Sequence, residues 1–359
     1  MPLSFQTLVG AAILLGTSAC GHSEAFESPI VPPLTAPFTT LPPIPLTFDE
    51  GMDRWATWSP DERGIWYSFQ PGGRSDGDVC LASMPGGGGT RREFCLTATA
   101  QESRRDAFDR PAPGPEGLLL YGHYTSNIGM LTLEDGELDL ATTAAPLEAR
   151  RLLSLPNNIG GIGFNHIGRI RWLARDHFVA VAEDETVIPH CASCTKRDTI
   201  YVGYGLLDAR ITADGATFRL IPGSLNANDF TLSVAGDSLY FTQSDDLVEF
   251  TTRGRTISSL PIGGGTAQVI YAGAGGLASV GRAGPRLILA TGGRVVALEV
   301  ASGVVSVLAS NGLTGARGYG SVTASTDGCR VLAEFARPRG LTFETNVYLL
   351  ATGNSNCAP

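Results

Sequence analysis

One short pattern recurs six times along the chain, and this repetition limits the fold more than any other feature of the sequence. Residues 55–69 read WATWSPDERGIWYSF: an apolar segment, a Ser-Pro-Asp turn and a second, alternating apolar segment. Related units follow at residues 111–121, 170–182, 231–241, 278–290 and 321–335. An internal repeat of this kind is typical of architectures in which each unit buries its apolar face against the next unit.

Most units continue with a second hairpin pattern, as in residues 128–140, 201–221, 247–260 and 295–308. Apolar and polar residues alternate there on both sides of a Gly-containing turn, which is the pattern of an antiparallel hairpin. No amphipathic helix is evident. The sequence therefore predicts an all-β fold, a six-bladed β-propeller of four-stranded antiparallel blades. The alternative, a pair of β-sandwiches, would leave the six similar units unexplained.

The two ends of the repeat region complement each other. The sixth unit ends at NSNCAP without an outer strand, and residues 44–50 have strand character but no partner. Pairing them would remove two open sheet edges. We therefore expect residues 46–48 to pair with the sixth unit and to close the last blade with an N-terminal strand.

The segment WSPDERGIWY, residues 58–67, resembles the repeat of TolB-type six-bladed propellers. The resemblance extends at the level of pattern over residues 45–357. It implies the propeller fold and a setting in the bacterial cell envelope. It does not imply an enzyme, because this repeat is a device for turning between strands.

The first 45 residues predict export. Residues 3–19 are uncharged and apolar, and Thr17, Ser18 and Ala19 before Cys20 resemble the bacterial lipobox, in which the cysteine carries lipid. An ordinary cleaved signal with an incidental Cys20 is the alternative. We expect a signal peptide over 1–19, a Pro-rich tether over 20–43 and the propeller domain over 44–359. Gly21 after the cysteine favours the outer membrane.

Six cysteines remain once Cys20 is assigned to lipid, and an exported chain uses such cysteines in disulfides. Cys80 and Cys95 flank the glycine turn at residues 86–89, so they are expected to face each other. Cys329 and Cys357 lie at adjoining strand ends of the sixth unit. The third pair is Cys191–Cys194, for which a redox centre, or a zinc site with His190, are the alternatives to a structural bridge.

Composition excludes some partners. The formal net charge is −9, Lys196 is the only lysine and the arginines form no basic block. Binding to nucleic acid is therefore not expected, and contact with the membrane is expected through the lipid anchor only.

Two motifs imitate catalytic sequences. Residues 236–239 spell the GDSL of a lipase family, but no histidine follows His190 and Ser238 falls in a strand turn. Residues 269–281 imitate a dinucleotide-binding loop, but Gly281, Gly284 and Pro285 interrupt the required helix.

We predict no catalytic residues, no cofactor and no metal. Calcium-dependent propeller lactonases would need carboxylate and amide ligands, for which the chain offers Asn157, Asn158, Asn165 and Asp229.

Binding is expected on loops at one face, because the blades are occupied by packing. The long connections are residues 98–110, 155–169 and 183–198. The candidate binding residues on them are Arg104, Arg105, Phe108, Asn165, His166, Arg169 and His190. The favoured interpretation is a lipid-anchored, non-catalytic scaffold that binds envelope proteins. The alternatives are a metal-dependent hydrolase or lactonase-like propeller enzyme, and a surface lipoprotein that binds a sugar or another small ligand.

Overall fold

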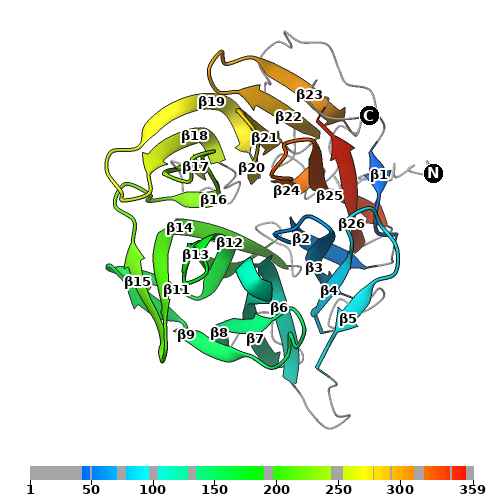
Figure 1. Cartoon of the computed structure of the whole chain (residues 1–359), viewed down its shortest axis with the longest axis vertical. Helices are drawn as coiled ribbons and strands as arrows, with labels where there is room; N and C mark the ends of the chain where they lie inside the picture. Colours follow the sequence, from blue (N-terminus) through cyan, green and yellow to red (C-terminus); the bar gives the residue numbers. More distant parts are fainter. Residues whose placement is uncertain are drawn as a thin grey trace, which may run out of the picture.

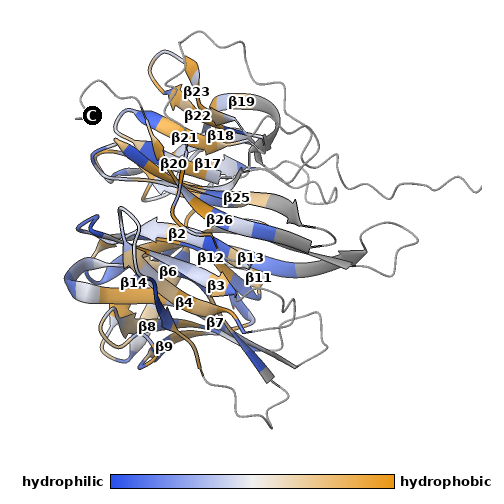
Figure 2. Ribbon diagram, turned by 90° about the vertical axis from the view of Figure 1, so that its right-hand side faces the viewer, coloured by the Kyte–Doolittle hydropathy of each residue, from blue (hydrophilic) through white to orange (hydrophobic). Residues whose placement is uncertain are grey.

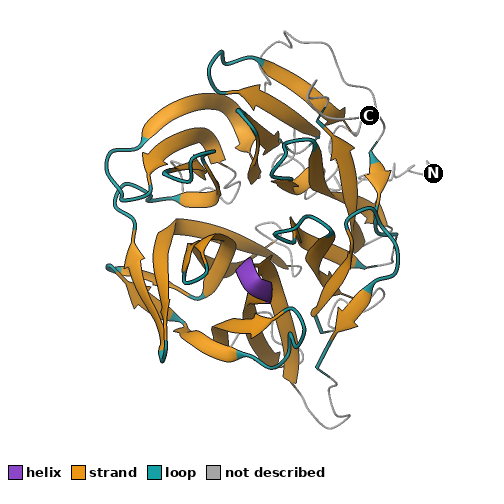
Figure 3. Cartoon of the chain, in the orientation of Figure 1, coloured by secondary structure: helices purple, strands orange, loops and turns teal. Residues whose placement is uncertain are grey.

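The computed structural model describes residues 43–48, 51–70, 78–96, 104–127, 135–189, 197–243, 254–277, 279–291, 293–310, 319–339 and 342–352. These segments form β-strands joined by turns, with one short 3-10 helix, η2 (Pro115–Gly117) (Figure 3). Within them, no helix has the length and hydropathy needed to span a bilayer.

Four sheets are separate, four-stranded and antiparallel, and each follows the chain order of its strands. The first sheet comprises β6 (Arg104–Pro113), β7 (Leu118–Asn127), β8 (Asp135–Thr142) and β9 (Arg150–Leu155). The second comprises β12 (His166–Ala174), β13 (His177–Pro189), β14 (Arg197–Thr212) and β15 (Gly215–Leu220). The third comprises β16 (Ala227–Leu232), β17 (Ser238–Gln243), β18 (Gly254–Pro261) and β19 (Gln268–Leu277). The fourth comprises β20 (Ser279–Ala283), β21 (Arg286–Ala290), β22 (Arg294–Glu299) and β23 (Val305–Ser310).

The remaining strands form an eight-stranded sheet and one small hairpin. The first half of the large sheet holds β2 (Met52–Trp58), β3 (Gly64–Gln70), β4 (Cys80–Pro85) and β5 (Arg92–Phe94). The second half holds β24 (Tyr319–Ala324), β25 (Arg330–Arg339), β26 (Thr342–Ala351) and β1 (Ile44–Pro45). The hairpin consists of β10 (Asn157–Ile159) and β11 (Ile162–Phe164).

The sheets stand around a common centre (Figure 1). The innermost strands contact one another in a closed circle, in the order β2, β6, β12, β16, β20, β24 and back to β2. Six clusters of buried apolar side chains lie between successive sheets or sheet halves around this circle. This arrangement is a β-propeller of four-stranded antiparallel blades, so the predicted fold class is confirmed.

The separate four-stranded sheets are fewer than the six blades predicted. β2 and β26 form one parallel pair, Met52 with Thr345, and the Thr345 N–H donates to Gly51 O at 3.0 Å. This pairing joins the first and last sheet halves into the eight-stranded sheet. The separate four-stranded blades therefore number four.

The N-terminal strand does pair with β26, but two residues earlier than expected. Ile44 pairs with Leu349 and Pro45 with Tyr348. The Leu46 N–H then donates to Val347 O at 2.8 Å, while Leu46 itself is buried. Burial of the Leu46 side chain in the cluster shared with β3 and β4 explains this register.

The strands are apolar on both faces because each sheet is packed between two others. In β3 every residue after Gly64 is buried, and such strands read as continuous apolar runs. Seen from the side, the long strands β13, β25 and β26 project toward the same face of the ring (Figure 2).

A hydrogen bond from a serine to a nearby aspartate recurs in the turns. The Oγ of Ser59 donates to Asp61 Oδ1 at 2.6 Å, and Ser325 repeats the bond to Asp327 at 2.5 Å. In the third separate sheet, Ser233 Oγ donates to Asp237 Oδ1 at 2.8 Å. Ser238, the serine of the GDSL imitation, begins β17 at this turn. Residues 269–281 likewise contribute to strands β19 and β20 rather than to a helix.

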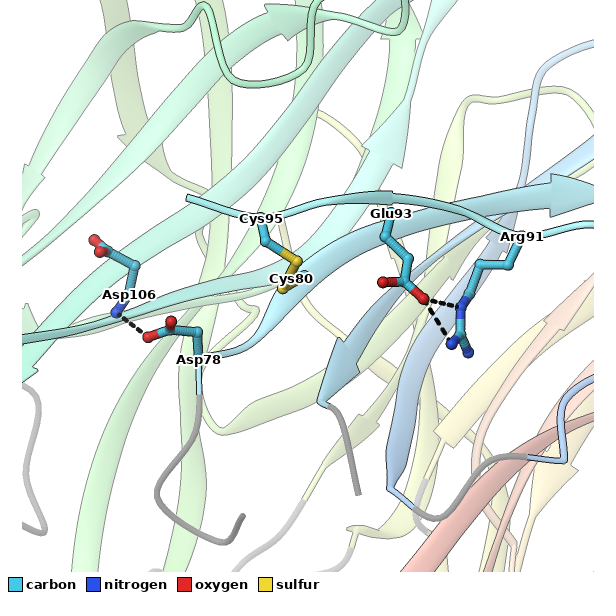
Figure 4. The surroundings of a disulfide bond; sticks show 6 residues. All are labelled: Asp78, Cys80, Arg91, Glu93, Cys95 and Asp106. Atoms are coloured by element: carbon cyan, nitrogen blue, oxygen red, sulfur yellow. Dashed lines mark hydrogen bonds and ion pairs between the residues drawn. A yellow bond between two sulfur atoms is a disulfide. The ribbon is translucent and has the colours of Figure 1, made fainter. Parts of the chain in front are cut away.

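The predicted Cys80–Cys95 disulfide is present and joins β4 to the segment after β5 (Figure 4). Near it, the Asp106 N–H donates to Asp78 Oδ1 at 3.2 Å, which ties this sheet half to β6. Cys329 is disulfide-bonded, and its predicted partner Cys357 lies outside the described residues. Cys20, His190, Cys191 and Cys194 also lie outside them.

Candidate functional site at the centre of the ring

Bulges turn polar side chains toward the centre of the ring. Five of the six innermost strands carry a register shift against their neighbours: β2, β6, β12, β16 and β24. At two of these bulges a residue adopts positive φ, Trp55 at 59° and Arg110 at 52°. A bulge changes the direction of a side chain and is frequent beside functional sites. The site is therefore built by irregularities in otherwise apolar strands.

Asp109 and His166 form a buried pair across neighbouring inner strands. His166 Nε2 lies 3.0 Å from Asp109 Oδ2, and the histidine ring is stacked on Tyr124 with 4.1 Å between centroids. Burial lowers the pKa of His166 to about 4, although the bond to Asp109 opposes this shift. Burial also opposes ionisation of Asp109, but the His166 bond and the Arg110 charge outweigh it and the pKa lies below the ordinary value of 3.8. A neutral imidazole therefore donates from Nε2 to an ionised carboxylate.

Arg110 and Glu183 form a second buried pair. Arg110 Nη2 lies 2.6 Å from Glu183 Oε2, and the guanidinium carbon lies 3.7 Å from the centre of the Trp55 ring. Burial raises the pKa of Glu183 to about 7, against the opposing charge of Arg110. Gly168 makes room for this carboxylate, because a Cβ at residue 168 would collide with Glu183 Oε1.

Arg169 connects four innermost strands. Its Nε lies 2.5 Å from Asp229 Oδ1 on β16, and its Nη2 donates to Ser279 Oγ on β20 and Ser321 Oγ on β24 at 2.9 and 2.6 Å. Only 8% of Arg169 is exposed. Asp229 Oδ2 in turn accepts from Val280 N at 3.0 Å. The charge of Arg169 is thus both neutralised and held in place by the sheets around it.

Two further carboxyls near the centre have a raised pKa. Burial raises the pKa of Glu185 and of Glu334 to about 7. Glu334 Oε1 accepts from Ala56 N at 3.1 Å. With Glu183, three carboxyls thus titrate near neutral pH around the centre of the ring. Groups with pKa values of this kind cluster at functional sites.

A separate cluster spans β6, β7 and β8 of the first separate sheet. His123 Nε2 is 2.9 Å from Asp106 Oδ1, and its Nδ1 is 3.3 Å from Glu137 Oε1 and 3.7 Å from Asp139 Oδ2. Burial would lower the pKa of His123, but the bonds to Asp139 and Asp106 outweigh it and raise the pKa to about 9. His123, Glu137 and Asp139 are close enough to hold a metal ion. A protonated imidazole between carboxylates needs no ion to explain it.

Most of the residues predicted to lie on binding loops belong to strands instead. Arg104, Arg105 and Phe108 belong to strand β6, and Phe108 is buried. His166 and Arg169 belong to β12, and His166 is 1% exposed. The loop assignment of these residues is wrong, because β6 and β12 begin earlier than the turn pattern indicates. Arg169 lies within the bulge of β12, between Ile167 and Ile170, and lines the central cavity.

Asn165 precedes β12 and is occupied by backbone bonds. Its Oδ1 accepts from Glu185 N at 2.6 Å and its Nδ2 donates to Glu185 O at 3.2 Å. The amide therefore positions β13 beside β12.

The sequence pattern did not predict Arg110, Arg171 and Glu183 as central residues. A charged residue inside an apolar strand was the available signal: β12 reads HIGRIRWLA. The burial of such charges requires partners, and the partners come from strands that are distant in sequence.

The residues that a calcium-dependent lactonase could use as ligands are not brought together. Asn157 and Asn158 lie on β10, where the Asn157 side chain donates to Ser154 O and accepts from Asn158 N. Asp229 is paired with Arg169, and Asn165 with Glu185, as described above. Three arginines also face the centre, so the residues present do not fit a divalent cation there.

Neither protein-family models nor curated proteins match this sequence. Solved structures do resemble it. The calcium-binding protein regucalcin from Agrobacterium tumefaciens is 11% identical and superposes with a TM-score of 0.53 over 88% of this chain and 95% of its own. The gluconolactonase XC5397 from Xanthomonas campestris is 14% identical, with a TM-score of 0.54 over 88% and 96% of the two chains. The phage phi92 endosialidase is 10% identical, with a TM-score of 0.55 over 88% and 70%.

The likeness shows the propeller fold. At these identities it shows nothing finer. The non-catalytic scaffold favoured by the sequence pattern is not supported: the similar structures include regucalcin and a gluconolactonase, and the buried charged residues lie in strands rather than on loops.

Proposed function

We propose that this protein is a lactonase-like hydrolase of a small molecule, with its active site at the centre of the ring. The Arg110–Glu183 pair carries the proposal. A carboxyl with a pKa of about 7 is suited to accept and return a proton at neutral pH, and a guanidinium 2.6 Å away is suited to stabilise a developing oxyanion.

In lactone hydrolysis, water attacks the carbonyl carbon and loses a proton. Glu183 lies behind Arg110 rather than in the cavity wall, so it accepts this proton through one intervening water molecule. Arg110 faces the carbonyl oxygen as negative charge develops on it. The ring C–O bond then breaks, and the ring oxygen takes the proton to give the hydroxy acid. His166, held neutral by burial beside Asp109, positions β12 against β6. No step is assigned to a metal ion.

The test is hydrolysis of a panel of lactones, beginning with gluconolactone, by the propeller domain produced in an oxidising compartment. We expect Glu183→Gln to lower kcat/KM by at least 100-fold, and activity to rise as pH passes through about 7. Glu148→Gln, on the exposed surface, is the matched control. EDTA should leave the rate unchanged. Equal rates for wild type and Glu183→Gln would refute the assignment.

The blade count belongs to the same proposal. We infer six blades, with the two halves of the eight-stranded sheet counted separately. Six inter-sheet apolar clusters and six innermost strands support this count.

The setting is also proposed. Export and lipidation at Cys20 would place the enzyme at the cell envelope, with the outer membrane favoured. The support is the apolar segment at residues 3–19 before Cys20.

A further inference from the structure

A cavity of about 20 Å³ lies at the centre of the ring, and every charged residue in its wall is an arginine. The wall includes Arg110, Arg169 and Arg171, together with the hydroxyl groups of Thr57, Ser321 and Thr323. Among the described residues, no carboxylate forms part of this wall. The cavity therefore presents positive charge and hydroxyl donors to whatever enters it.

The carboxylates that neutralise two of these arginines lie behind the wall. Asp229 pairs with Arg169, and Glu183 pairs with Arg110. Arg171 differs from both. Its Nη1 donates to Thr57 Oγ1 at 3.2 Å and its Nη2 to Thr323 Oγ1 at 3.3 Å. In the described part of the chain, no carboxylate lies within ion-pairing distance of Arg171.

The charged form of Arg171 is consequently disfavoured. Burial, with the like charge of Arg169 second, lowers the pKa of Arg171 to about 9. Arg171 is half-buried, and a charge largely removed from water is normally paired. The negative charge of Asp229 opposes this shift only in part, and a bound anion beside Arg171 would add a direct countercharge.

We propose that this cavity binds the carboxylate group of a small organic acid, through Arg171 and the hydroxyls of Thr57 and Thr323. A planar carboxylate matches the two-donor edge of a guanidinium. The cavity has room for a group about the size of one or two water molecules, which suits one carboxylate. The inference goes beyond the proposed reaction, because carboxylate binding does not require that the channel catalyse anything.

The test is a titration of the propeller domain with sodium acetate, followed by calorimetry and by thermal shift. Ionic strength is held constant with a bulky sulfonate. Wild type should show saturable binding and a rise in Tm. Arg171→Met should weaken the acetate affinity at least tenfold, whereas Arg175→Met should not. Arg175 is the matched control, since it is exposed and pairs with Glu116 at 2.9 Å.

Thr323→Val provides a second test in case Arg171→Met does not fold. It keeps the arginine and removes one hydroxyl, and it should weaken acetate binding about threefold to tenfold. The absence of saturable binding by wild type, or equal affinities in wild type and both cavity variants, would overturn the proposal.

Two further titrations distinguish anion binding from cation binding, and carboxylate binding from phosphate binding. Calcium, added as the salt of the same sulfonate, should not bind, and saturable calcium binding without acetate binding would make the centre a cation site. Inorganic phosphate should bind more weakly than acetate; equal or tighter binding would overturn the carboxylate assignment. Lactone hydrolysis by wild type and Glu183→Gln tests the proposed reaction, whereas the acetate titration tests the cavity. The two measurements are independent, so either proposal can fail while the other holds.

Discussion

His166 Nε2 lies 3.0 Å from Asp109 Oδ2, although 57 positions separate the two residues in the chain. The pair joins β6 to β12 inside the ring, next to the Arg110–Glu183 pair. Asp109 Oδ1 also accepts from Arg110 N at 3.0 Å and from Ser68 Oγ at 3.3 Å. One carboxylate thus connects three sheets or sheet halves.

Replacing this carboxylate should destabilise the whole ring. We expect Asp109→Asn to lower the free energy of unfolding by about 3 kcal/mol, because removal of one partner from a buried charge network leaves the others uncompensated. Urea denaturation measures the change. Asp214→Asn, in an exposed turn, should shift the midpoint little. A similar midpoint for both variants would contradict the role given to Asp109.

Gly168→Ala should disturb the centre of the ring without changing any charge. The added Cβ meets Glu183 Oε1, so the carboxylate must move away from Arg110. We expect a loss of about 2 kcal/mol in stability and a loss of lactone hydrolysis if that activity is found. The control is Gly163→Ala on β11, where a Cβ meets only the Asn158 amide at 4.0 Å. An unaffected Gly168→Ala variant would show that the close approach is readily relieved.

The His123 cluster should make stability depend on pH. The pKa of His123 is raised to about 9 in the folded state, against 6.5 in the unfolded chain. Its contribution is therefore complete below about pH 6.5 and is lost as pH rises through 9. We expect His123→Gln to remove about 2 kcal/mol of the difference in unfolding free energy between pH 6 and pH 9. Parallel pH profiles for wild type and variant would disprove this.

The Cys80–Cys95 disulfide should stabilise the domain by closing a short loop. The cysteines are 15 positions apart, for which chain entropy gives about 3 kcal/mol. The double variant Cys80→Ser, Cys95→Ser should unfold at a correspondingly lower denaturant concentration. Adding a reductant should shift the unfolding midpoint of the double variant only as far as the remaining disulfides contribute to it.

Lipidation can be tested in a bacterial host that processes lipoproteins. Cys20→Ala in the full chain should abolish incorporation of labelled palmitate and release the protein from the membrane fraction. Ser18→Ala, which keeps a small residue before the cysteine, should remain labelled. The absence of label in the wild type would show that the signal is an ordinary one, and equal label in both proteins would place the lipid at another residue.

Local sequence determined the turns, the strand alternation and one disulfide. Ser-x-Asp turns form within a few residues, as the Ser59–Asp61 and Ser325–Asp327 bonds show. Cys80 and Cys95 face each other because a glycine turn lies midway between them. These features depend on backbone geometry and nearest neighbours, and a sequence displays both directly.

Only the tertiary structure decided the centre of the ring. Arg169 on β12 reaches Ser279 and Ser321, which are 110 and 152 residues away, and Glu183 meets Arg110 from a different sheet. Bulges in the inner strands redirect these side chains, and no local pattern in the sequence marks the bulges. Burial then moves the pKa values of Glu183 and Arg171, and burial is a property of the closed ring rather than of any segment. The sequence therefore determined how each blade forms, whereas closure of the ring determined which charges meet inside it.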